Sequence, residues 1–216
     1  MKIGIVGGTG GIGEGMALRL APYHEVIIGS RDVEKACSVS EGTVACLRDQ
    51  GLKGHCIGLC NQDTVDEGDI IVLAIPYRFV ESTLQELTGF EDKIVVSPVN
   101  PIEKSDSFYY APPDEGSAAQ RIARLLPQSA KVVTAFNNIA ANRWKDLADA
   151  LDYSVAVCGD DDRAKAEVMQ LINTISNLRA FDAGPLRMSS IVESITPLLL
   201  NLARFNQMKD VGIRFV

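Results

Sequence analysis

A glycine-rich turn near the N-terminus constrains the fold of this chain more than any other feature. The apolar run KIGIV comes first, a stretch that fits G-x-G-x-x-G follows it, and a helical pattern comes next. A backbone without side chains can lie against a pyrophosphate, and the N–H groups that open the helix face the same anion. A tight turn that binds nothing is the alternative, since glycine also serves plain turns. We expect a dinucleotide-binding loop made of Gly8, Thr9, Gly10, Gly11, Ile12 and Gly13.

Apolar strands alternate with helices along most of the chain, and several strands are continuous runs of Val, Ile and Leu, as in sheets covered on both faces. Strands are expected at Lys2–Val6, Glu25–Gly29, His55–Leu59, Ile70–Ile75, Ile94–Ser97, Lys131–Ala135, Ser154–Cys158 and Leu178–Phe181. Helices are expected at Gly11–Ala21, Val33–Gln50, Tyr77–Leu87, Ala118–Leu126, Asn142–Leu151 and Arg163–Ile175. This order predicts an α/β fold with a Rossmann-like, doubly wound, mostly parallel sheet.

The character of the sequence changes after residue 185. The segment 186–216 is helical in pattern and is apolar over most of its circumference around Ile195 to Leu202. Such a helix must be buried against the main domain, a second subunit or a ligand. We therefore expect a dinucleotide-binding domain over residues 1–185 and a small C-terminal helical segment over residues 186–216.

Composition excludes several classes of function. The formal charge of −7, without any Lys/Arg-rich run, argues against nucleic acid as the main partner. The chain starts without a signal-peptide pattern, and its longest apolar stretch, Ile195–Ala203, is too short to span a bilayer. Five cysteines without a C-x-x-C pair favour free thiols over disulfides or a metal site. We expect a cytoplasmic protein that contacts no membrane and holds no metal.

The residues after the second expected strand indicate which dinucleotide binds. NAD sites usually carry Asp or Glu there for the ribose hydroxyls, whereas NADP sites need a cation and polar donors for the 2′-phosphate. Ser30 can hydrogen-bond that phosphate, Arg31 can grip it, and Lys35 can add a charge. These residues favour NADP. Asp32 would still suit NAD if the turn were shifted by one residue, and solvated surface charges are the other alternative for Arg31 and Lys35.

Later segments point towards the same crevice. Ile75 leaves the fourth expected strand, where an apolar shelf normally supports the nicotinamide. Loop signals cluster at residues 97–106 and 110–116, and loops at the carboxyl ends of parallel strands bind ligands in doubly wound folds. Plain core packing explains the apolar residues equally well.

Seven segments of the chain, in their order, resemble a known family. They are GGTGGIGEGMALRLA, IIGSRDVEKA, LAIPY, KIVVSPVNP, VAVCGDDD, FDAGPL and VESITPLLLNLARFN. The sequence resembles the small archaeal and bacterial NADPH-dependent reductases of coenzyme F420, from the first strand to the last residue. The resemblance implies a Rossmann-like domain with a small C-terminal helical domain, a homodimer, and reversible hydride transfer between NADP and the deazaflavin coenzyme F420.

The resemblance also implies the site residues. NADP would be held by Thr9, Gly10, Gly11, Ile12, Ser30, Arg31 and Lys35, and Ile75 would back the nicotinamide. The deazaflavin would lie against the closing helix, near Asn137, Asn138, Ile139, Ser194, Thr196 and Pro197. Direct hydride transfer asks the protein for orientation, close approach and exclusion of water, so no catalytic side chain is expected.

The chain departs from some relatives at two places. They have His-Thr-Ile-Pro where this chain has Asn-Asn-Ile-Ala at residues 137–140, and an arginine near Ser190. Asparagine can neither carry a charge nor titrate as histidine does. Arg187 is a candidate for the missing arginine, and an exposed loop charge is the alternative.

The closing helix poses a question of geometry. Ser194 and Thr196 are two residues apart, so a regular helix does not place both on one face. Either Pro197 breaks the helix and both hydroxyls reach the ligand, or only one does. Glu193 and Asn201 serve either the ligand or hydrogen bonds between helices or subunits.

Two rival functions stay open at this point. One is an NADP-dependent imine or carbonyl reductase, which would need a larger helical domain than the segment after residue 185 supplies. The other is a non-catalytic NADP-binding redox sensor, which would suit the lack of an acid–base pair.

Overall fold

The computed structural model describes residues 1–148 and 150–216 and is built around one large sheet. The sheet has eight strands in the order β10-β9-β8-β5-β4-β1-β2-β3. They are β1 (Lys2–Val6), β2 (Glu25–Ser30), β3 (His55–Cys60), β4 (Ile70–Leu73), β5 (Ile94–Ser97), β8 (Lys131–Thr134), β9 (Ser154–Gly159) and β10 (Arg179–Asp182). Neighbouring strands are parallel except β8 and β9. The predicted α/β fold with a doubly wound, mostly parallel sheet is confirmed.

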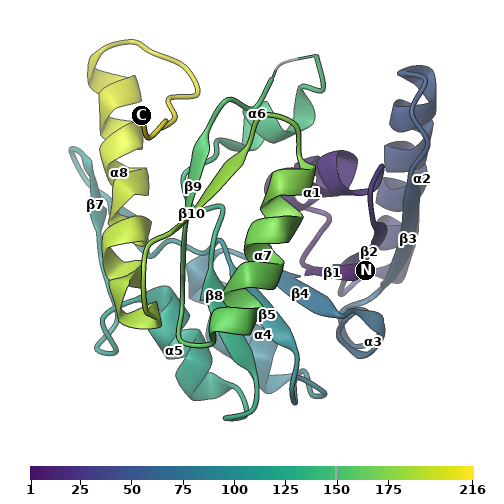
Figure 1. The fold of residues 1–216 in the computed structure, drawn as a ribbon, viewed down its shortest axis with the longest axis horizontal. Coiled ribbons are helices and arrows are strands. Elements are labelled where there is room, and N and C mark those ends of the chain that lie inside the picture. Colours follow the sequence, from purple (N-terminus) through teal and green to yellow (C-terminus); the bar gives the residue numbers. More distant parts are fainter. Residues whose placement is uncertain (149) are drawn as a thin grey trace.

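Helices cover both faces of the sheet (Figure 1). One face packs against α1 (Gly11–Leu20), α2 (Val33–Asp49), α6 (Ala141–Lys145) and α7 (Asp162–Thr174). The other packs against α3 (Asn61–Glu67), α4 (Val80–Gln85), α5 (Ala118–Leu125) and α8 (Ser189–Phe205).

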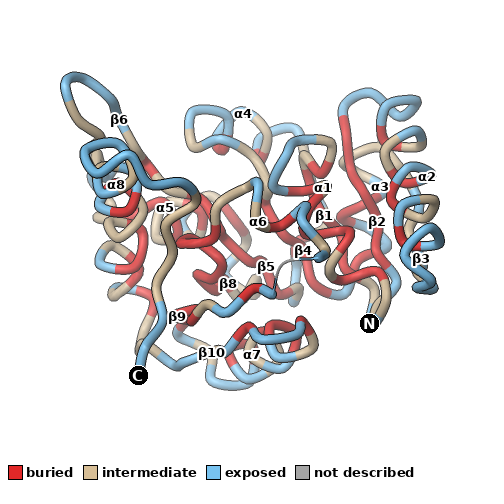
Figure 2. Tube along the Cα trace, turned by 90° about the horizontal axis from the view of Figure 1, so that it is seen from above, coloured by how far each residue is buried: buried red, intermediate tan, exposed pale blue. Residues whose placement is uncertain are grey.

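Strand β4 shows why the apolar runs form central strands. Ile70 and Val72 belong to the core on the α1 side, while Ile71 and Leu73 belong to the core on the α4 side. Successive side chains of a strand point to opposite faces, so a strand covered on both sides must be apolar at every position. Burial is therefore concentrated in the strands at the middle of the molecule, and exposed residues lie on the outer helices and loops (Figure 2).

Two expected helices are shorter than their sequence patterns suggested. The helix expected at Asn142–Leu151, of which residue 149 lies outside the described residues, ends at Lys145. There the Arg19 guanidinium of α1 donates to the carbonyl oxygens of Arg143, Trp144 and Asp146. A side chain from a distant helix thus satisfies the end of α6. The helix expected at Tyr77–Leu87 begins as a 3-10 turn, η1 (Tyr77–Phe79), before α4.

A short hairpin occupies part of the region expected to be loop. Its strands are β6 (Ile102–Lys104) and β7 (Phe108–Tyr110), which pair antiparallel. The Asn201 side chain of α8 donates to the carbonyl oxygen of Phe108 (2.6 Å) and accepts from its N–H (2.9 Å). The hairpin therefore lies along α8, at the end of the sheet away from α2 and β3 (Figure 1). The division of the chain at residue 185 stays a prediction.

Glu193 holds α8 to the start of α5 and to the hairpin. Its carboxylate is fully buried and accepts from the N–H groups of Ala118 (2.9 Å) and Ala119 (3.0 Å), in the first turn of α5. It also accepts from the Tyr110 hydroxyl (3.0 Å). A carboxylate at the start of a helix is stabilised by the free N–H groups and by the helix dipole. Of the two roles expected for Glu193 and Asn201, hydrogen bonding between elements is the one that the structure shows.

The pKa of Glu193 predicts how stability changes with pH. Burial raises this pKa from 4.5 to about 7, although the helix N–H groups and Tyr110 lower it. The folded chain therefore binds this proton more tightly than the unfolded chain does. The stability that the group contributes is complete below pH 4.5 and is lost as pH rises through 7. Relative to Glu193→Gln, the wild-type free energy of unfolding should fall by up to about 3 kcal/mol over that range.

Urea unfolding of both proteins at several pH values measures this difference. The titratable neighbours Tyr110, Tyr77 and Cys158 all have a pKa raised by burial, so they keep their protons across the range. A difference that stayed flat, or rose with pH, would contradict a buried ionisable carboxyl.

Candidate functional site

Two adjoining cavities lie at the carboxyl ends of the central strands, where doubly wound folds bind their ligands. The polar cavity, about 570 Å³, is lined by Gly7, Thr9, Gly10, Ser30, Arg31, Asp32, Lys35, Asn61, Ala74, Ile75, Pro76, Phe79, Ser82, Thr83 and Glu86. The apolar cavity, about 400 Å³, is lined by Gly10, Gly11, Ile12, Leu73, Ala74, Ile75, Pro76, Tyr77, Pro98, Val99, Asn100, Ile102 and Thr196. The two cavities share Gly10 and the segment 74–76, so they form one cleft.

The glycines of the turn have two distinct roles. A Cβ on Gly13 would lie 2.5 Å from the Cα of Gly8, so these two residues allow α1 to approach the end of β1. The Gly8 N–H donates to the carbonyl oxygens of Ile5 (3.1 Å) and Gly29 (2.8 Å), which fixes the turn. Gly8 and Gly13 line neither cavity, so their role in the structure is close packing.

Gly10 instead faces the cleft. A Cβ built there meets only the Gly7 carbonyl oxygen, at 3.8 Å, and would project into the space that Gly10 lines. Gly10 is also the N-cap of α1, and no side chain of the described residues caps this helix. The N–H groups of the first turn are therefore available to an anion, and the helix dipole favours one. These features fit the pyrophosphate of a dinucleotide.

The residues predicted to select NADP lie together in the polar cavity. Ser30 is buried, and its hydroxyl oxygen accepts from the Asp32 N–H (3.1 Å), which leaves the hydroxyl proton for a ligand. The Asp32 carboxylate accepts from the Lys35 N–H (3.1 Å) as the N-cap of α2. Arg31 and Lys35 are exposed at the cavity, and neither forms an ion pair with a described residue. The capping contact holds the Asp32 carboxylate at the start of α2, and the cavity beside it is lined by two cations and the Ser30 hydroxyl.

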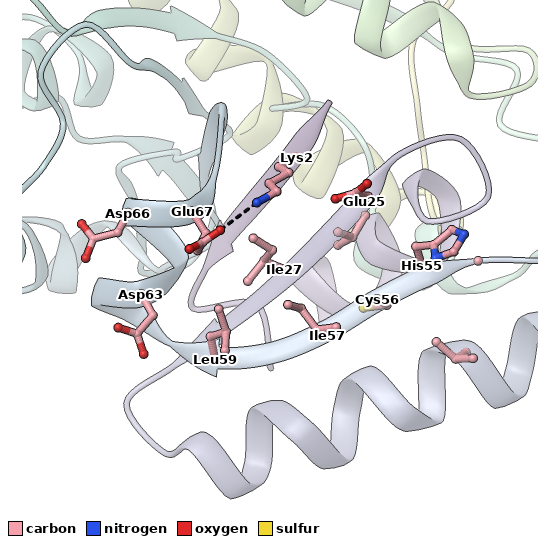
Figure 3. A pocket seen from close by; sticks show the side chains of 13 residues that line it. Lys2, Glu25, Ile27, His55, Cys56, Ile57, Leu59, Asp63, Asp66 and Glu67 are labelled. Atoms are coloured by element: carbon pink, nitrogen blue, oxygen red, sulfur yellow. Dashed lines mark hydrogen bonds and ion pairs between the residues drawn. The ribbon is translucent and has the colours of Figure 1, made fainter.

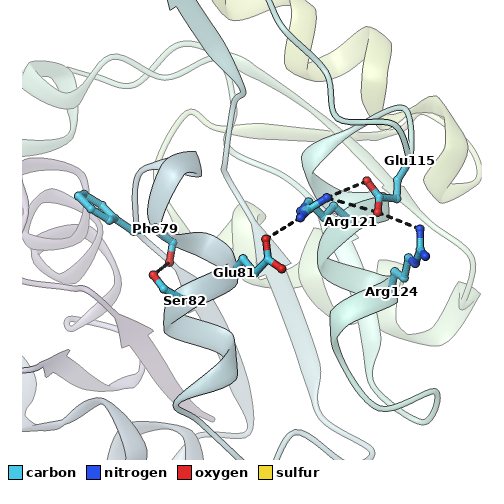
Figure 4. Close-up of polar contacts among 6 residues, drawn as sticks. All are labelled: Phe79, Glu81, Ser82, Glu115, Arg121 and Arg124. Carbon is cyan, nitrogen blue, oxygen red and sulfur yellow. Dashed lines mark hydrogen bonds and ion pairs between the residues drawn. The ribbon is translucent and has the colours of Figure 1, made fainter.

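One wall of the polar cavity was missed by the sequence reasoning. It consists of Phe79, Ser82, Thr83 and Glu86, from η1 and the helix after it. The Ser82 hydroxyl donates to the Phe79 carbonyl oxygen (3.2 Å), and the Phe79 ring extends away from the helix (Figure 4). The spacing of 3, 1 and 3 residues places these side chains on one helix face, and this signal could have found them.

An ion-pair network holds this wall in place. Arg121 of α5 contacts Glu81 of α4 (2.6 Å) and Glu115 (3.2 Å), which also contacts Arg124 (3.1 Å), as Figure 4 shows. The network ties α4 to α5 and so fixes η1, from which Tyr77 and Phe79 reach the two cavities.

The apolar cavity suits uncharged rings. No charged side chain of the described residues lines it, and Ile75 forms part of the wall that it shares with the polar cavity. Burial raises the pKa of Tyr77, so its hydroxyl stays neutral at the edge of this cavity. Ile75 lies where the sequence predicted a shelf, just beyond the end of β4 at Leu73.

The residues expected near the second cofactor divide into two groups. Thr196 lines the apolar cavity and donates to the carbonyl oxygen of Asn137 (2.7 Å). Asn137 is buried behind that wall. Its side-chain NH₂ group donates to the Val99 carbonyl oxygen (3.2 Å) and to Asn100 Oδ1 (3.1 Å). The Oδ1 of Asn137 has no hydrogen-bond partner among the described residues. These contacts join Asn137 to three residues of the cavity wall.

Asn138 and Ile139 do not line either cavity. The Asn138 amide donates to the carbonyl oxygen of Ser154 (2.8 Å), and Ile139 is part of the apolar core. Both side chains are buried, and this structure gives them a packing role.

Helix α8 continues through Pro197 to Phe205. Of the two expected hydroxyls, only that of Thr196 reaches the apolar cavity, and that of Ser194 donates back to the Ile191 carbonyl oxygen (2.7 Å). Pro197 is buried outside the cavity lining, and Arg187 is exposed and lines neither cavity. Of the two residues, only Thr196 therefore lies at the cavity.

A larger cavity, about 750 Å³, lies at the other edge of the sheet. It is formed near the amino ends of β2 and β3, beside the ion pair of Lys2 and Glu67 (2.7 Å), as Figure 3 shows. Ligand sites in parallel sheets lie at the opposite, carboxyl ends, and the glycine turn does not reach this cavity. We therefore place the functional site in the double cleft, although each of its two cavities is smaller than this one.

Two further expectations concern metals and membranes. Within residues 1–148 and 150–216, no group of three or more His, Cys, Asp or Glu side chains is arranged to hold a metal ion. The five cysteines are free thiols. Over the same residues, every helix is too short or too polar to cross a membrane.

Comparison with known proteins gives matches to enzymes that use NADP. A family model described as NADP oxidoreductase, coenzyme F420-dependent, matches residues 2–101. A crystal structure of a candidate F420-dependent NADP reductase from Arthrobacter sp. FB24 has a TM-score of 0.81 and 26% identity, covering 100% of this chain and 99% of that one.

Two curated relatives match along the whole chain. The F420-dependent NADP reductase of Methanocaldococcus jannaschii is 41% identical, over 99% of this chain and 97% of its own. That of Methanothermobacter marburgensis is 36% identical, over 99% of this chain and 97% of its own. Identity at this level over both full lengths, on the same fold, means that this chain belongs to the F420-dependent NADP reductase family.

Proposed function

We propose that this chain catalyses reversible hydride transfer between NADP(H) and the deazaflavin coenzyme F420. The observation that carries the proposal is the shared wall of the two cavities: Ile75 lines both of them, so ligands in the two spaces meet at one side chain. The reaction is that of relatives up to 41% identical, which are F420-dependent NADP reductases. The redox chemistry is supplied by the two coenzymes when they are bound.

The chain itself binds the two coenzymes, orients them and excludes water from between them. We assign the pyrophosphate to the loop residues Thr9, Gly10, Gly11 and Ile12, and the 2′-phosphate to Ser30, Arg31 and Lys35. Three donors of different geometry around one phosphate fix its position and also balance its negative charge. We assign the deazaflavin to the apolar cavity, where Thr196 and Tyr77 are the polar groups of the wall beside Asn100. Holding two rings in contact converts a bimolecular transfer into an oriented one.

We also propose that the protein is a homodimer that associates through α8. Ile191, Leu198, Leu202 and Phe205 are exposed and lie on one face of this helix, at spacings of 7, 4 and 3 residues. An apolar stripe of this kind marks an interface, and a helix that packs on its own copy gives a two-fold contact. Free cysteines suit a reducing compartment, and we place the protein in the cytoplasm.

The reaction can be tested directly with purified protein. Mixing it with NADPH and oxidised F420 should bleach the absorption band of the deazaflavin, because reduction removes the conjugation of the ring. The reverse reaction, from reduced F420 and NADP, should restore it. Binding of NADPH, seen by its fluorescence, without any bleaching would refute the proposed function and favour a sensor.

The assignment of the 2′-phosphate predicts a selective loss of affinity. The double variant Arg31→Ala/Lys35→Ala should bind NADPH at least about tenfold more weakly, because charge-assisted hydrogen bonds are lost. NADH, which lacks the phosphate, should bind the variant as it binds the wild type. Fluorescence titration measures both affinities, and Lys53→Ala, at an exposed lysine outside the cleft, is the matched control. Equal losses for NADPH and NADH would refute the assignment.

The α8 interface predicts a change of oligomeric state. Leu198→Asp/Leu202→Asp places charges in the exposed apolar stripe and should give a folded monomer, since neither side chain is part of the core. Light scattering coupled to size-exclusion chromatography gives the mass of each protein. Leu52→Asp changes a leucine of similar exposure on another surface and should remain dimeric. A monomeric wild type, or a dimeric double variant, would contradict the proposal.

A further inference from the structure

Glu193 is a fully buried ionisable group that the proposed reaction does not use. Each of its oxygens has a partner: Oε1 accepts from the Ala119 N–H (3.0 Å), and Oε2 accepts from both the Ala118 N–H (2.9 Å) and the Tyr110 hydroxyl (3.0 Å). A buried carboxylate is costly unless its oxygens are satisfied in this way. The contacts join α8 to two elements that lie much earlier in the sequence, β7 and the start of α5.

Glu193 and its three partners form a junction of β7, α5 and α8. Both β7 and α8 connect this junction to the wall of the apolar cavity. On the hairpin, Tyr110 is the direct cross-strand partner of Ile102, which lines the cavity. On α8, Thr196 follows Glu193 by three residues, so the two lie on the same side of the helix. Thr196 lines the cavity as well and bonds to the Asn137 carbonyl oxygen (2.7 Å). Glu193 is therefore linked to Ile102 through Tyr110, and to Thr196 through one turn of α8.

The path from Glu193 to the polar cavity is longer, because it runs along α5 and through the partly exposed ion pair of Arg121 with Glu81 to α4. The walls of the polar cavity come from the glycine turn, the β2–α2 turn, η1 and α4. The hydrogen bonds of the Glu193 carboxylate reach only Tyr110, Ala118 and Ala119, none of which lines that cavity. A change at Glu193 should therefore act more strongly on the apolar cavity than on the polar one, because an exposed ion pair transmits little of it.

We propose that Glu193 is a positioning residue for the second coenzyme: by holding the hairpin and α8 to the start of α5 it sets the separation between Ile102, Thr196 and the opposite wall at Ile75. This inference rests on the proposed function, because it assigns the deazaflavin to the apolar cavity. It assigns Glu193 no contact with either coenzyme and no part in proton transfer. Its effect is on the affinity for F420, which depends on how closely these walls fit the ring.

The test compares the affinity for each coenzyme in Glu193→Gln and the wild type. In either orientation of the amide, at least one helix N–H faces an NH₂ group in place of an oxygen, so the junction loosens. The dissociation constant of F420, from its fluorescence, should rise about tenfold, while that of NADPH changes less than about twofold. The KM values should follow the same split, with kcat less affected than KM for F420.

Three further measurements make the result specific. Tyr110→Phe removes the hydroxyl that contacts Glu193 (3.0 Å) and the Gly116 carbonyl oxygen (3.2 Å) but leaves both helix N–H bonds of Glu193, so it should weaken F420 binding in the same direction by a smaller factor. Glu167→Gln alters a carboxylate on α7 that pairs with Arg163 and lines neither cavity, and it should leave F420 binding unchanged. Hydrogen exchange should become faster in Glu193→Gln at the hairpin and at the first turn of α5, and stay unchanged in the glycine turn.

The outcomes separate this inference from the proposed function. Wild-type protein that fails to bind or reduce F420 would overturn the function, and the inference with it. Normal wild-type activity together with equal losses for NADPH and F420 in Glu193→Gln, or with no loss for either, would overturn the positioning role alone.

Discussion

The arrangement of the cleft depends on how closely the backbone of α1 approaches the end of β1. The Cβ that any other residue would place at Gly13 would lie 2.5 Å from Gly8, so the contact exists only between glycines. It directs the start of α1 at the cleft and brings Gly10 to the boundary between the two cavities. The anion site and its position relative to the apolar wall thus follow from one close contact between backbones.

A second feature completes the cleft from the far end of the chain. The antiparallel pairing of β8 with β9 reverses the direction of the last two strands, and α8 then covers the face of β9 beside the hairpin. Without α8 the apolar cavity would lack Thr196, and the hairpin would lack the Asn201 and Glu193 bonds that hold it. The part of the fold that carries the glycine turn and the part that closes the apolar cavity are therefore separate in sequence and joined by a few buried polar contacts.

The sequence predicted those features that depend on local chemistry. The glycine turn, the cations after β2 and Ile75 were found because turn geometry, charge and strand ends are visible in short segments. The hairpin was missed because its strands have three residues each and its stabilising partner, Asn201, lies 93 residues from Phe108. The early end of α6 was missed for the same reason, since Arg19 caps it from another helix.

The site residues taken from the family resemblance show the same limit. Sequence position placed Asn138 near the second coenzyme, but its amide is used by the Ser154 carbonyl oxygen, a contact that requires the β8–β9 connection to be known. The choice between Ser194 and Thr196 needed the phase of α8, which Pro197 left open. Phe79 and its neighbours could have been found from helical spacing. Their place in the cavity wall follows from the helix face on which they lie and depends on no partner that is distant in sequence.

The wall at Ile75 gives the cleft a property that neither cavity has alone. The side chain is a boundary of both spaces, and a Cβ on Gly7 would lie 2.4 Å from its Cγ2, so the wall is held on one side by the glycine turn itself. A displacement of Ile75 that enlarges one space narrows the other. Any such displacement couples the two binding equilibria, and thermodynamic linkage requires the coupling to be equal in both directions. The order in which two ligands occupy the cleft then changes the path of binding and leaves the total free energy the same.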